Sequence, residues 1–76
     1  MTETGLATGE TPGAQTLRRG LSILKLLARS QPDGMRISDI GRRLGLSKAT
    51  AVRLTQTLVD ERFVVHDAAS RCYRLG

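Results

Sequence analysis

The stretch ISDIGRRLGLSKATAVRLTQ, residues 37–56, constrains the fold more than any other part of the chain. Two short helices can meet at a wide angle across a tight turn only if small and apolar residues stand at fixed positions. Gly41 stands where the two helices must approach closely, and Gly45 stands where the turn requires a left-handed backbone. The buried positions of the pattern are Ile40, Leu44, Leu46, Ala51 and Leu54. The spacing therefore predicts a helix-turn-helix over about residues 37–56.

Both helices of this motif carry start and stop signals. Ser38 is expected to cap the first helix, and Gly45 is expected to end it. Ser47 is expected to cap the second helix, which continues to about Glu61. A brief extended segment, Met35–Ile37, is predicted just before the motif.

An amphipathic helix is predicted ahead of the motif, over about residues 16–30. Its apolar arc consists of Leu17, Leu21, Ile23, Leu24, Leu27 and Ala28. Leu26 does not fit this arc, because it falls on the polar side of the helix. It is therefore either an isolated exposed leucine or a contact in a dimer interface.

Alternating apolar and polar runs near the end of the chain predict a β-hairpin. Phe63–His66 is its first strand, with Phe63 buried, and Arg71–Leu75 is its second strand. The predicted order is helix, short strand, helix, helix, hairpin. This order describes a winged helix-turn-helix, a mainly α fold with a small β-hairpin wing over about residues 63–75.

Charge divides the chain into a neutral-to-acidic tail and a basic domain. Residues 1–15 hold no base and almost no large apolar side chain, so a disordered tail is predicted there, before one domain over residues 16–76. The chain has 12 Lys and Arg residues against 7 Asp and Glu residues, and Glu3 and Glu10 fall in the tail. Most of the bases are arginine, whose planar guanidinium suits phosphate and guanine edges. The balance favours nucleic acid as the partner.

The second helix of the motif presents a polar face opposite its buried arc, as a recognition helix does in the major groove. Arg53 is expected to contact guanine O6 and N7, and Gln56 is expected to pair with adenine. Ala49 and Thr50 are small enough to let the helix lie deep in the groove and to touch a thymine methyl group. These four residues are the predicted base contacts. Val52 is expected to pack inside the protein.

Contacts with the DNA backbone are predicted on both sides of this helix. The predicted phosphate contacts are Arg36, Ser38, Arg42, Arg43, Ser47, Lys48, Arg71 and Arg74. Arg71 and Arg74 belong to the wing, which would lie along the backbone or in the minor groove. For the arginines of this set, the alternative is a plain surface charge.

Several function classes find little support in the sequence. No apolar run exceeds three residues, and the first residues lack a basic start and an apolar stretch, so neither a transmembrane helix nor a secretory signal is predicted. One cysteine and one histidine exclude a Cys/His zinc finger. Cys72 and His66 have no third residue that would orient them for nucleophilic catalysis. We therefore expect a cytoplasmic, non-enzymatic chain without metal or cofactor.

Two other binding functions stay open at this stage. A winged helix can serve as a protein-interaction module, although the predicted recognition helix offers no acid before Asp60. RNA binding is disfavoured, because Phe63 and Tyr73 are the only aromatic residues and provide no platform for stacked bases.

Residues 15–76 resemble the N-terminal DNA-binding domain of IclR-type bacterial transcriptional regulators. The resemblance rests on LRRGLSILKLLA, on ISDIGRRLGLSKATAVRLTQTL and on YRLG at the end of the hairpin. It implies binding to a pseudo-palindromic operator in double-stranded DNA, as repressor or activator, at the bacterial nucleoid. It also implies a homodimer in the full-length regulator, held partly through the first helix. A further C-terminal domain that senses a small molecule is implied, and no effector site is expected in this chain.

Two positions depart from the family pattern. Arg62 stands where the family usually has glycine, at the exit of the recognition helix. A left-handed backbone at this arginine would cost about 1 kcal/mol and would be able to shift the start of the wing. Thr55 stands where the family tends to have an aliphatic residue, which removes one side chain from the core.

Overall fold

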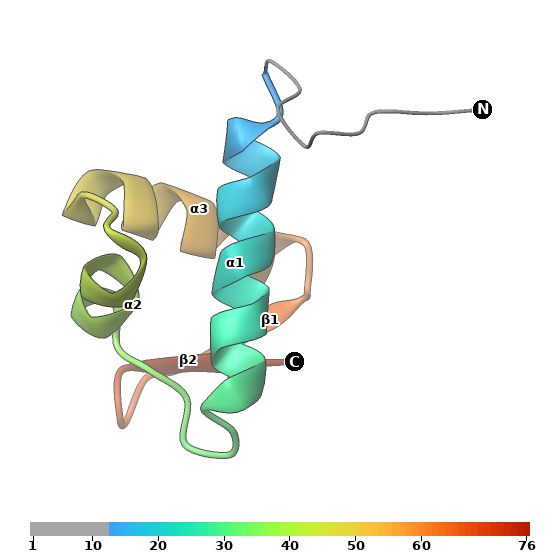
Figure 1. The fold of residues 1–76 in the computed structure, drawn as a ribbon. Helices are drawn as coiled ribbons and strands as arrows, with labels where there is room; N and C mark the ends of the chain where they lie inside the picture. The colour runs from blue at the N-terminus through green and yellow to red at the C-terminus, as the bar shows by residue number, and fades with distance from the viewer. Residues whose placement is uncertain (1–12) are drawn as a thin grey trace.

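The computed structural model describes residues 13–76, which form three helices and one hairpin (Figure 1). The elements are α1 (Gln15–Arg29), α2 (Ile37–Leu44), α3 (Lys48–Asp60), β1 (Val64–Asp67) and β2 (Cys72–Leu75). Their order and type confirm the predicted winged helix-turn-helix. Of the predicted tail, residues 1–12 lie outside the described part of the chain, and Gln15 already belongs to α1. Within residues 13–76, no helix combines the length and apolar character needed to cross a membrane.

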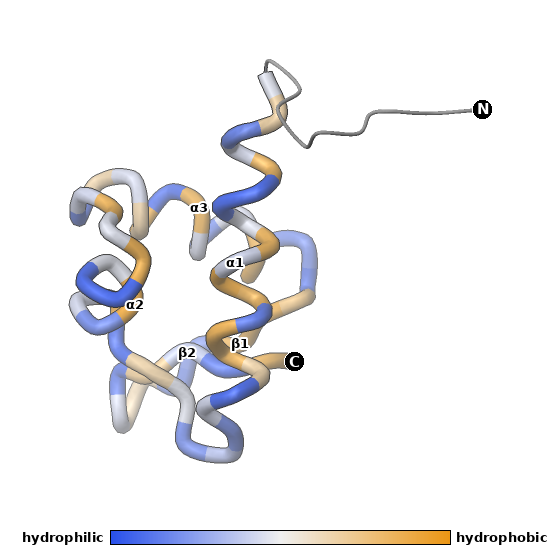
Figure 2. The backbone as a smooth tube through the Cα atoms, in the orientation of Figure 1, coloured by the Kyte–Doolittle hydropathy of each residue, from blue (hydrophilic) through white to orange (hydrophobic). Residues whose placement is uncertain are grey.

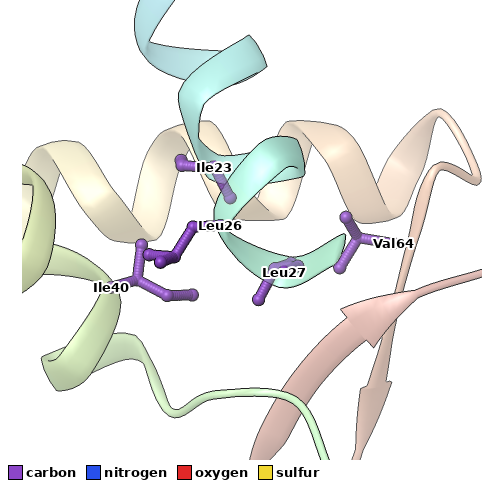
Figure 3. Packing of buried hydrophobic residues seen from close by; sticks show 5 residues of the cluster. All are labelled: Ile23, Leu26, Leu27, Ile40 and Val64. Carbon is purple, nitrogen blue, oxygen red and sulfur yellow. The ribbon is translucent and has the colours of Figure 1, made fainter. Parts of the chain in front are cut away.

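The second half of α1 forms the centre of the core. Ile23, Leu26 and Leu27 are almost fully buried there, together with Ile40 of α2 and Val64 of β1. Figure 3 shows Leu26 beside Ile40 and Leu27 on the side of the hairpin. One helix therefore joins the helix-turn-helix to the wing.

The face that α1 buries differs from the predicted arc. Leu26 is 4% exposed and lies inside the protein's own core, so its prediction as an exposed or dimer-interface residue is wrong. Leu17 and Leu21, predicted to be buried, are 65% and 47% exposed, and Ala28 is also exposed. The reason is three-dimensional: the first turns of α1 extend beyond the other elements (Figure 1), whereas its second half contacts helices on one side and the hairpin on another.

The turn between α2 and α3 has the predicted geometry. A Cβ atom at Gly41 would lie 3.1 Å from the Leu46 carbonyl oxygen and 3.7 Å from the Ala51 Cβ, so a side chain there would crowd the turn between the two helices, and glycine fits the close approach. Gly45 has a φ of +67°, which is the predicted left-handed conformation. Ser47 caps α3, because its side chain accepts a hydrogen bond from the backbone N–H of Thr50.

Helix α2 begins two residues earlier than predicted. Its N-cap residue is Arg36, and the Arg36 carbonyl accepts hydrogen bonds from the N–H groups of Asp39 and Ile40 at 3.0 and 3.1 Å. Ser38 therefore lies inside the first turn and is not the cap, and Arg36 makes no side-chain capping bond. The predicted Ser38 cap was wrong because the extended segment is shorter than Met35–Ile37.

The wing is an antiparallel pair of strands that is attached to the loop before α2. The strands pair from Val64 with Leu75 to Asp67 with Cys72. Met35 and Tyr73 exchange two backbone hydrogen bonds, of 2.9 and 2.7 Å. Met35 therefore forms an isolated antiparallel bridge on the edge of β2. The predicted short strand before the motif is thus reduced to this one bridge.

Two arginines of the wing region have left-handed backbones. Arg62 follows α3 with a φ of +70°, and Arg71 ends the turn of the hairpin with a φ of +63°. The backbone at Arg62 therefore keeps the conformation that favours glycine, at a cost of about 1 kcal/mol. The next residue, Phe63, is 59% exposed, so its predicted burial was wrong, and Val64 takes the buried position.

Thr55 is the one buried polar side chain among residues 13–76, and it generates a prediction about stability. Its Oγ1 atom has no hydrogen-bond partner in the described structure, although the residue is fully buried. A buried hydroxyl without a partner keeps its desolvation penalty. We expect Thr55→Val to raise the free energy of unfolding by about 1–2 kcal/mol, measured by urea denaturation.

Thr57→Val is the matched control for this substitution. It also removes a hydroxyl from α3, but Thr57 is exposed and its Oγ1 donates to the Arg53 carbonyl at 2.9 Å. We expect no stabilisation from it. An unchanged or lower denaturation midpoint for Thr55→Val would show that the buried hydroxyl is satisfied in solution.

Candidate nucleic-acid interface

The outward face of α3 is accessible along its first two turns. Lys48, Ala49, Arg53 and Gln56 are all exposed, as predicted, and Thr50 is half-buried on the flank. Their common exposure follows from the burial of the opposite side, where Ala51 and Thr55 contact the core. The face is small and polar near the N-terminus of the helix, and it carries basic side chains without an acid before Asp60.

Hydrogen bonds within α3 separate the roles that Arg53 and Gln56 can play. The Gln56 Nε2 atom donates to the Asp60 carboxylate at 3.0 Å, so this side chain is turned toward the C-terminal end of the helix. Within residues 13–76, Arg53 makes no ion pair, and its guanidinium is free to reach a partner. Of the predicted base-contacting residues, Arg53 is thus the long side chain with no other commitment in the described structure.

Val52 was predicted to pack inside the protein, but it lies on the outer face of α3. Val52 is 42% exposed, one helical turn after Lys48 and one before Gln56. Its exposure adds an apolar contact point to a face that was predicted to be polar. The i, i+4 spacing between Lys48 and Val52 was the sequence signal that could have predicted this exposure.

The basic residues of α2 and its approach are exposed on the helix that packs against α3. Arg42 is exposed and pairs with Asp39 at 2.6 Å within the same helix. Arg43, Arg36 and Ser38 are exposed without such a pair in the described residues. Ser47 is also exposed, but its hydroxyl is occupied with capping α3.

The two faces of the wing carry different charges. Val65, Asp67 and Arg74 lie on the outer face, where Arg74 approaches Asp67 to 3.6 Å. A hydrogen bond from the Ser70 hydroxyl, supported by the Ala69 N–H, lowers the pKa of Asp67 below its ordinary value. An ionised Asp67 therefore offsets the charge of Arg74 on this face.

The inner face of the wing borders a cleft of about 350 Å³ that opens between the hairpin and the N-terminal ends of α2 and α3. Its polar lining residues are Arg36, Ser38, Lys48, His66, Arg71 and Tyr73. Four of them were predicted as phosphate contacts from separate parts of the sequence, and the fold brings them together. His66 and Tyr73 were not among the predicted contacts.

Arg71 and Arg74 therefore lie on different faces of the wing. Arg71 lines the cleft and makes no ion pair among residues 13–76, whereas Arg74 is on the opposite face beside an acid. Alternation along β1 was the available signal for His66: it lies two residues after Val64, which faces the core.

A second open surface is apolar and lies on the other side of the domain. A groove of about 380 Å³ runs between the first half of α1 and the C-terminal half of α3. Leu17, Leu21 and Phe63 line it and are each about half exposed or more. Figure 2 shows that apolar and polar positions alternate along the first half of α1, which extends beyond the other elements.

Comparisons with known proteins agree with this geometry. The sequence model of the IclR helix-turn-helix domain matches residues 16–68. The chain is 44% identical over 62 residues to the glycerol operon regulatory protein of Streptomyces coelicolor, a match that covers 82% of this chain and 24% of that protein. It is 34% identical over 64 residues to an HTH-type transcriptional regulator of Mycobacterium tuberculosis, covering 84% of this chain and 24% of the relative.

A similar fold occurs in a solved structure. An IclR transcriptional regulator from Alicyclobacillus acidocaldarius superposes with a TM-score of 0.75 at 38% sequence identity, over 80% of this chain and 24% of that one. The chain thus spans about a quarter of the length of the relatives it matches. These relatives carry the names of regulators of gene expression.

Proposed function

This chain belongs to the IclR family of DNA-binding transcriptional regulators, and from that premise we propose that it recognises a specific double-stranded operator through α3. The observation that supports the proposal most is the exposed face of α3, where Arg53 has no partner among residues 13–76 and no acid occurs before Asp60. A helix with such a face fits the major groove, where its N-terminal residues contact base edges.

The proposed base contacts follow the geometry of this face. Arg53 contacts guanine O6 and N7 with its two-pronged guanidinium, while Ala49 and Thr50 allow the helix to approach closely. Val52 is exposed beside them and suits a thymine methyl group. Gln56 reaches adenine only if its bond to Asp60 is released, so we assign it the weakest contribution.

The proposed backbone contacts surround α3 on both sides. On the side of α2 they are made by Arg36, Ser38, Arg42 and Arg43, and at the start of α3 by Ser47 and Lys48. On the side of the wing, Arg71 faces the same cleft, and Arg74 contributes less because Asp67 offsets its charge. These contacts orient the domain on the duplex without specifying a sequence.

We further propose that the domain acts as a homodimer on a pseudo-palindromic operator in the cytoplasm, within a longer regulator that carries an effector-binding domain. The exposed Leu17, Leu21 and Phe63 support an association through the apolar groove on the first half of α1. Apolar groups exposed together on a small domain mark contact surfaces. A two-fold protein dimer matches two half-sites separated by one or more helical turns of DNA.

The experiment that tests the proposed function is enrichment of bound sequences from a pool of random duplexes. We expect a consensus with two inverted half-sites, because each α3 reads one half-site. A pool that stays random after repeated selection would contradict sequence-specific recognition. It would favour a winged helix that serves as a protein-interaction module.

Arg53→Ala should weaken binding to the enriched duplex by about 1–3 kcal/mol and relax the preference at one base position per half-site. Fluorescence anisotropy on the consensus duplex and on single-base variants measures both effects. The matched control is Lys48→Ala, in the same helix, which should weaken binding to all duplexes equally. An equal loss on consensus and random DNA for Arg53→Ala would identify Arg53 as a phosphate contact.

Leu21→Glu should remove the coupling between two copies on the duplex with two half-sites. The carboxylate would be buried in an apolar interface, so binding to the full site should fall by about tenfold or more while binding to a single half-site is retained. The control is Gln15→Glu, which adds the same charge near the other side of α1, where Gln15 borders Arg19 and Leu44. Equal losses on full and half-sites for Leu21→Glu would place the dimer contact elsewhere.

A further inference from the structure

The cleft between the wing and the helix-turn-helix concentrates positive charge without a neighbouring acid. Arg36 enters it from the start of α2, Lys48 from the start of α3, and Arg71 from the turn of the hairpin. Within residues 13–76 none of the three makes an ion pair, and no acid lines the cleft. A cluster of this kind is electrostatically unfavourable unless an anion occupies it.

Acidic residues near the cleft are engaged elsewhere. Asp39 pairs with Arg42 at 2.6 Å on α2. Asp67, next to His66 in sequence, lies on the outer face of the wing with Arg74. The only charged or titratable side chains that face the cleft are therefore the three bases, His66 and Tyr73, among the residues that the structure describes.

His66 has a fixed place in the wall of the cleft. It pairs with Tyr73 across the hairpin, and the two rings stack with centroids 4.3 Å apart and an angle of 17° between their planes. Tyr73 is itself held by its two backbone hydrogen bonds to Met35. The stack restricts the imidazole before any ligand arrives, which lowers the entropic cost of a contact.

The start of α2 adds backbone donors to the same cleft. Ile37 and Ser38 are the first two residues of α2, and both line the cleft. The N-cap residue Arg36 provides no side-chain capping bond, and the first N–H groups already bonded to its carbonyl are those of Asp39 and Ile40, so the N–H groups of Ile37 and Ser38 are open to an external acceptor. In α3, by contrast, Ser47 already occupies the Thr50 N–H.

From these observations we infer that the cleft binds one phosphate of the DNA backbone, and that His66 contacts it as an imidazolium. The inference rests on the proposed function. It adds His66 to the proposed DNA contacts and the uptake of one proton to the binding step. An oxygen anion beside the ring favours the protonated form, so binding of DNA takes up a proton. Affinity therefore falls as pH rises, because the neutral ring must be protonated or lose the contact.

The test compares the pH dependence of DNA binding for the 76-residue chain and its His66 variants. Fluorescence anisotropy is measured with a labelled duplex of mixed sequence at constant, low ionic strength between pH 5.5 and 8. The wild-type Kd should rise on the order of three- to tenfold over this range. His66→Gln should bind with a Kd close to the wild-type value at pH 8 and should show a flat profile. His66→Lys should bind tightly at all pH values, because its charge does not change in this range.

Arg29→Gln is the matched control, because it removes a positive charge from an exposed position at the end of α1, outside the cleft. It should keep the pH dependence of the wild type. Superimposable profiles for wild type and His66→Gln would overturn the inference and leave the proposed function intact. Absence of binding to any duplex by the folded wild-type chain would instead contradict the proposed function itself.

Thermal unfolding followed by circular dichroism separates a local role of His66 from a structural one. His66 is exposed, so both variants should unfold close to the wild-type temperature in the absence of DNA. If His66→Lys binds no better than His66→Gln at pH 8 while both are folded, the ring does not contact a phosphate and the inference fails.

Discussion

The pair of hydrogen bonds between Met35 and Tyr73 fixes the position of the wing, and the basic cleft beside the wing depends on it. A two-stranded hairpin alone is marginally stable, so its orientation must come from contacts with the body of the domain. Gly34 makes the bridge possible: its φ is +79°, and a Cβ atom there would collide with the Tyr73 carbonyl. Because the bridge holds β2 against the loop before α2, the inner face of the wing comes to border the first turns of α2 and α3.

The second constraint is the packing of one helix on two partners. The second half of α1 contacts both the helix-turn-helix and the hairpin, and its three buried residues form an i, i+3, i+4 stripe that is rotated from the predicted arc. The first half has no such partners, and its leucines stay exposed along a groove. The same apolar periodicity therefore stabilises the fold at one end of α1 and leaves an exposed apolar groove at the other.

These two constraints explain which features of the fold and of the cleft the sequence predicts and which it does not. The turn between α2 and α3 was predictable because its requirements are local: Gly41, Gly45 and Ser47 act within a few residues of one another. The burial of Leu26 was not, because it depends on α2, a separate element, packing against α1. The cleft was predicted only as separate phosphate contacts, since it joins Arg36 to residues about thirty positions later through the bridge.

Arg62 and Arg71 share a left-handed backbone, which is strained for a residue other than glycine. Glycine would relieve about 1 kcal/mol at each position, yet Arg62 and Arg71 are compensated in different ways. Arg62 follows the C-terminus of α3, where a positive charge interacts favourably with the helix dipole by about 0.3–1 kcal/mol. Arg71 has no helix end beside it and instead lines the cleft, so its compensation would come from a bound phosphate. The strain at Arg62 is thus partly offset within the free domain, whereas the strain at Arg71 would be offset only by the proposed contact with a phosphate.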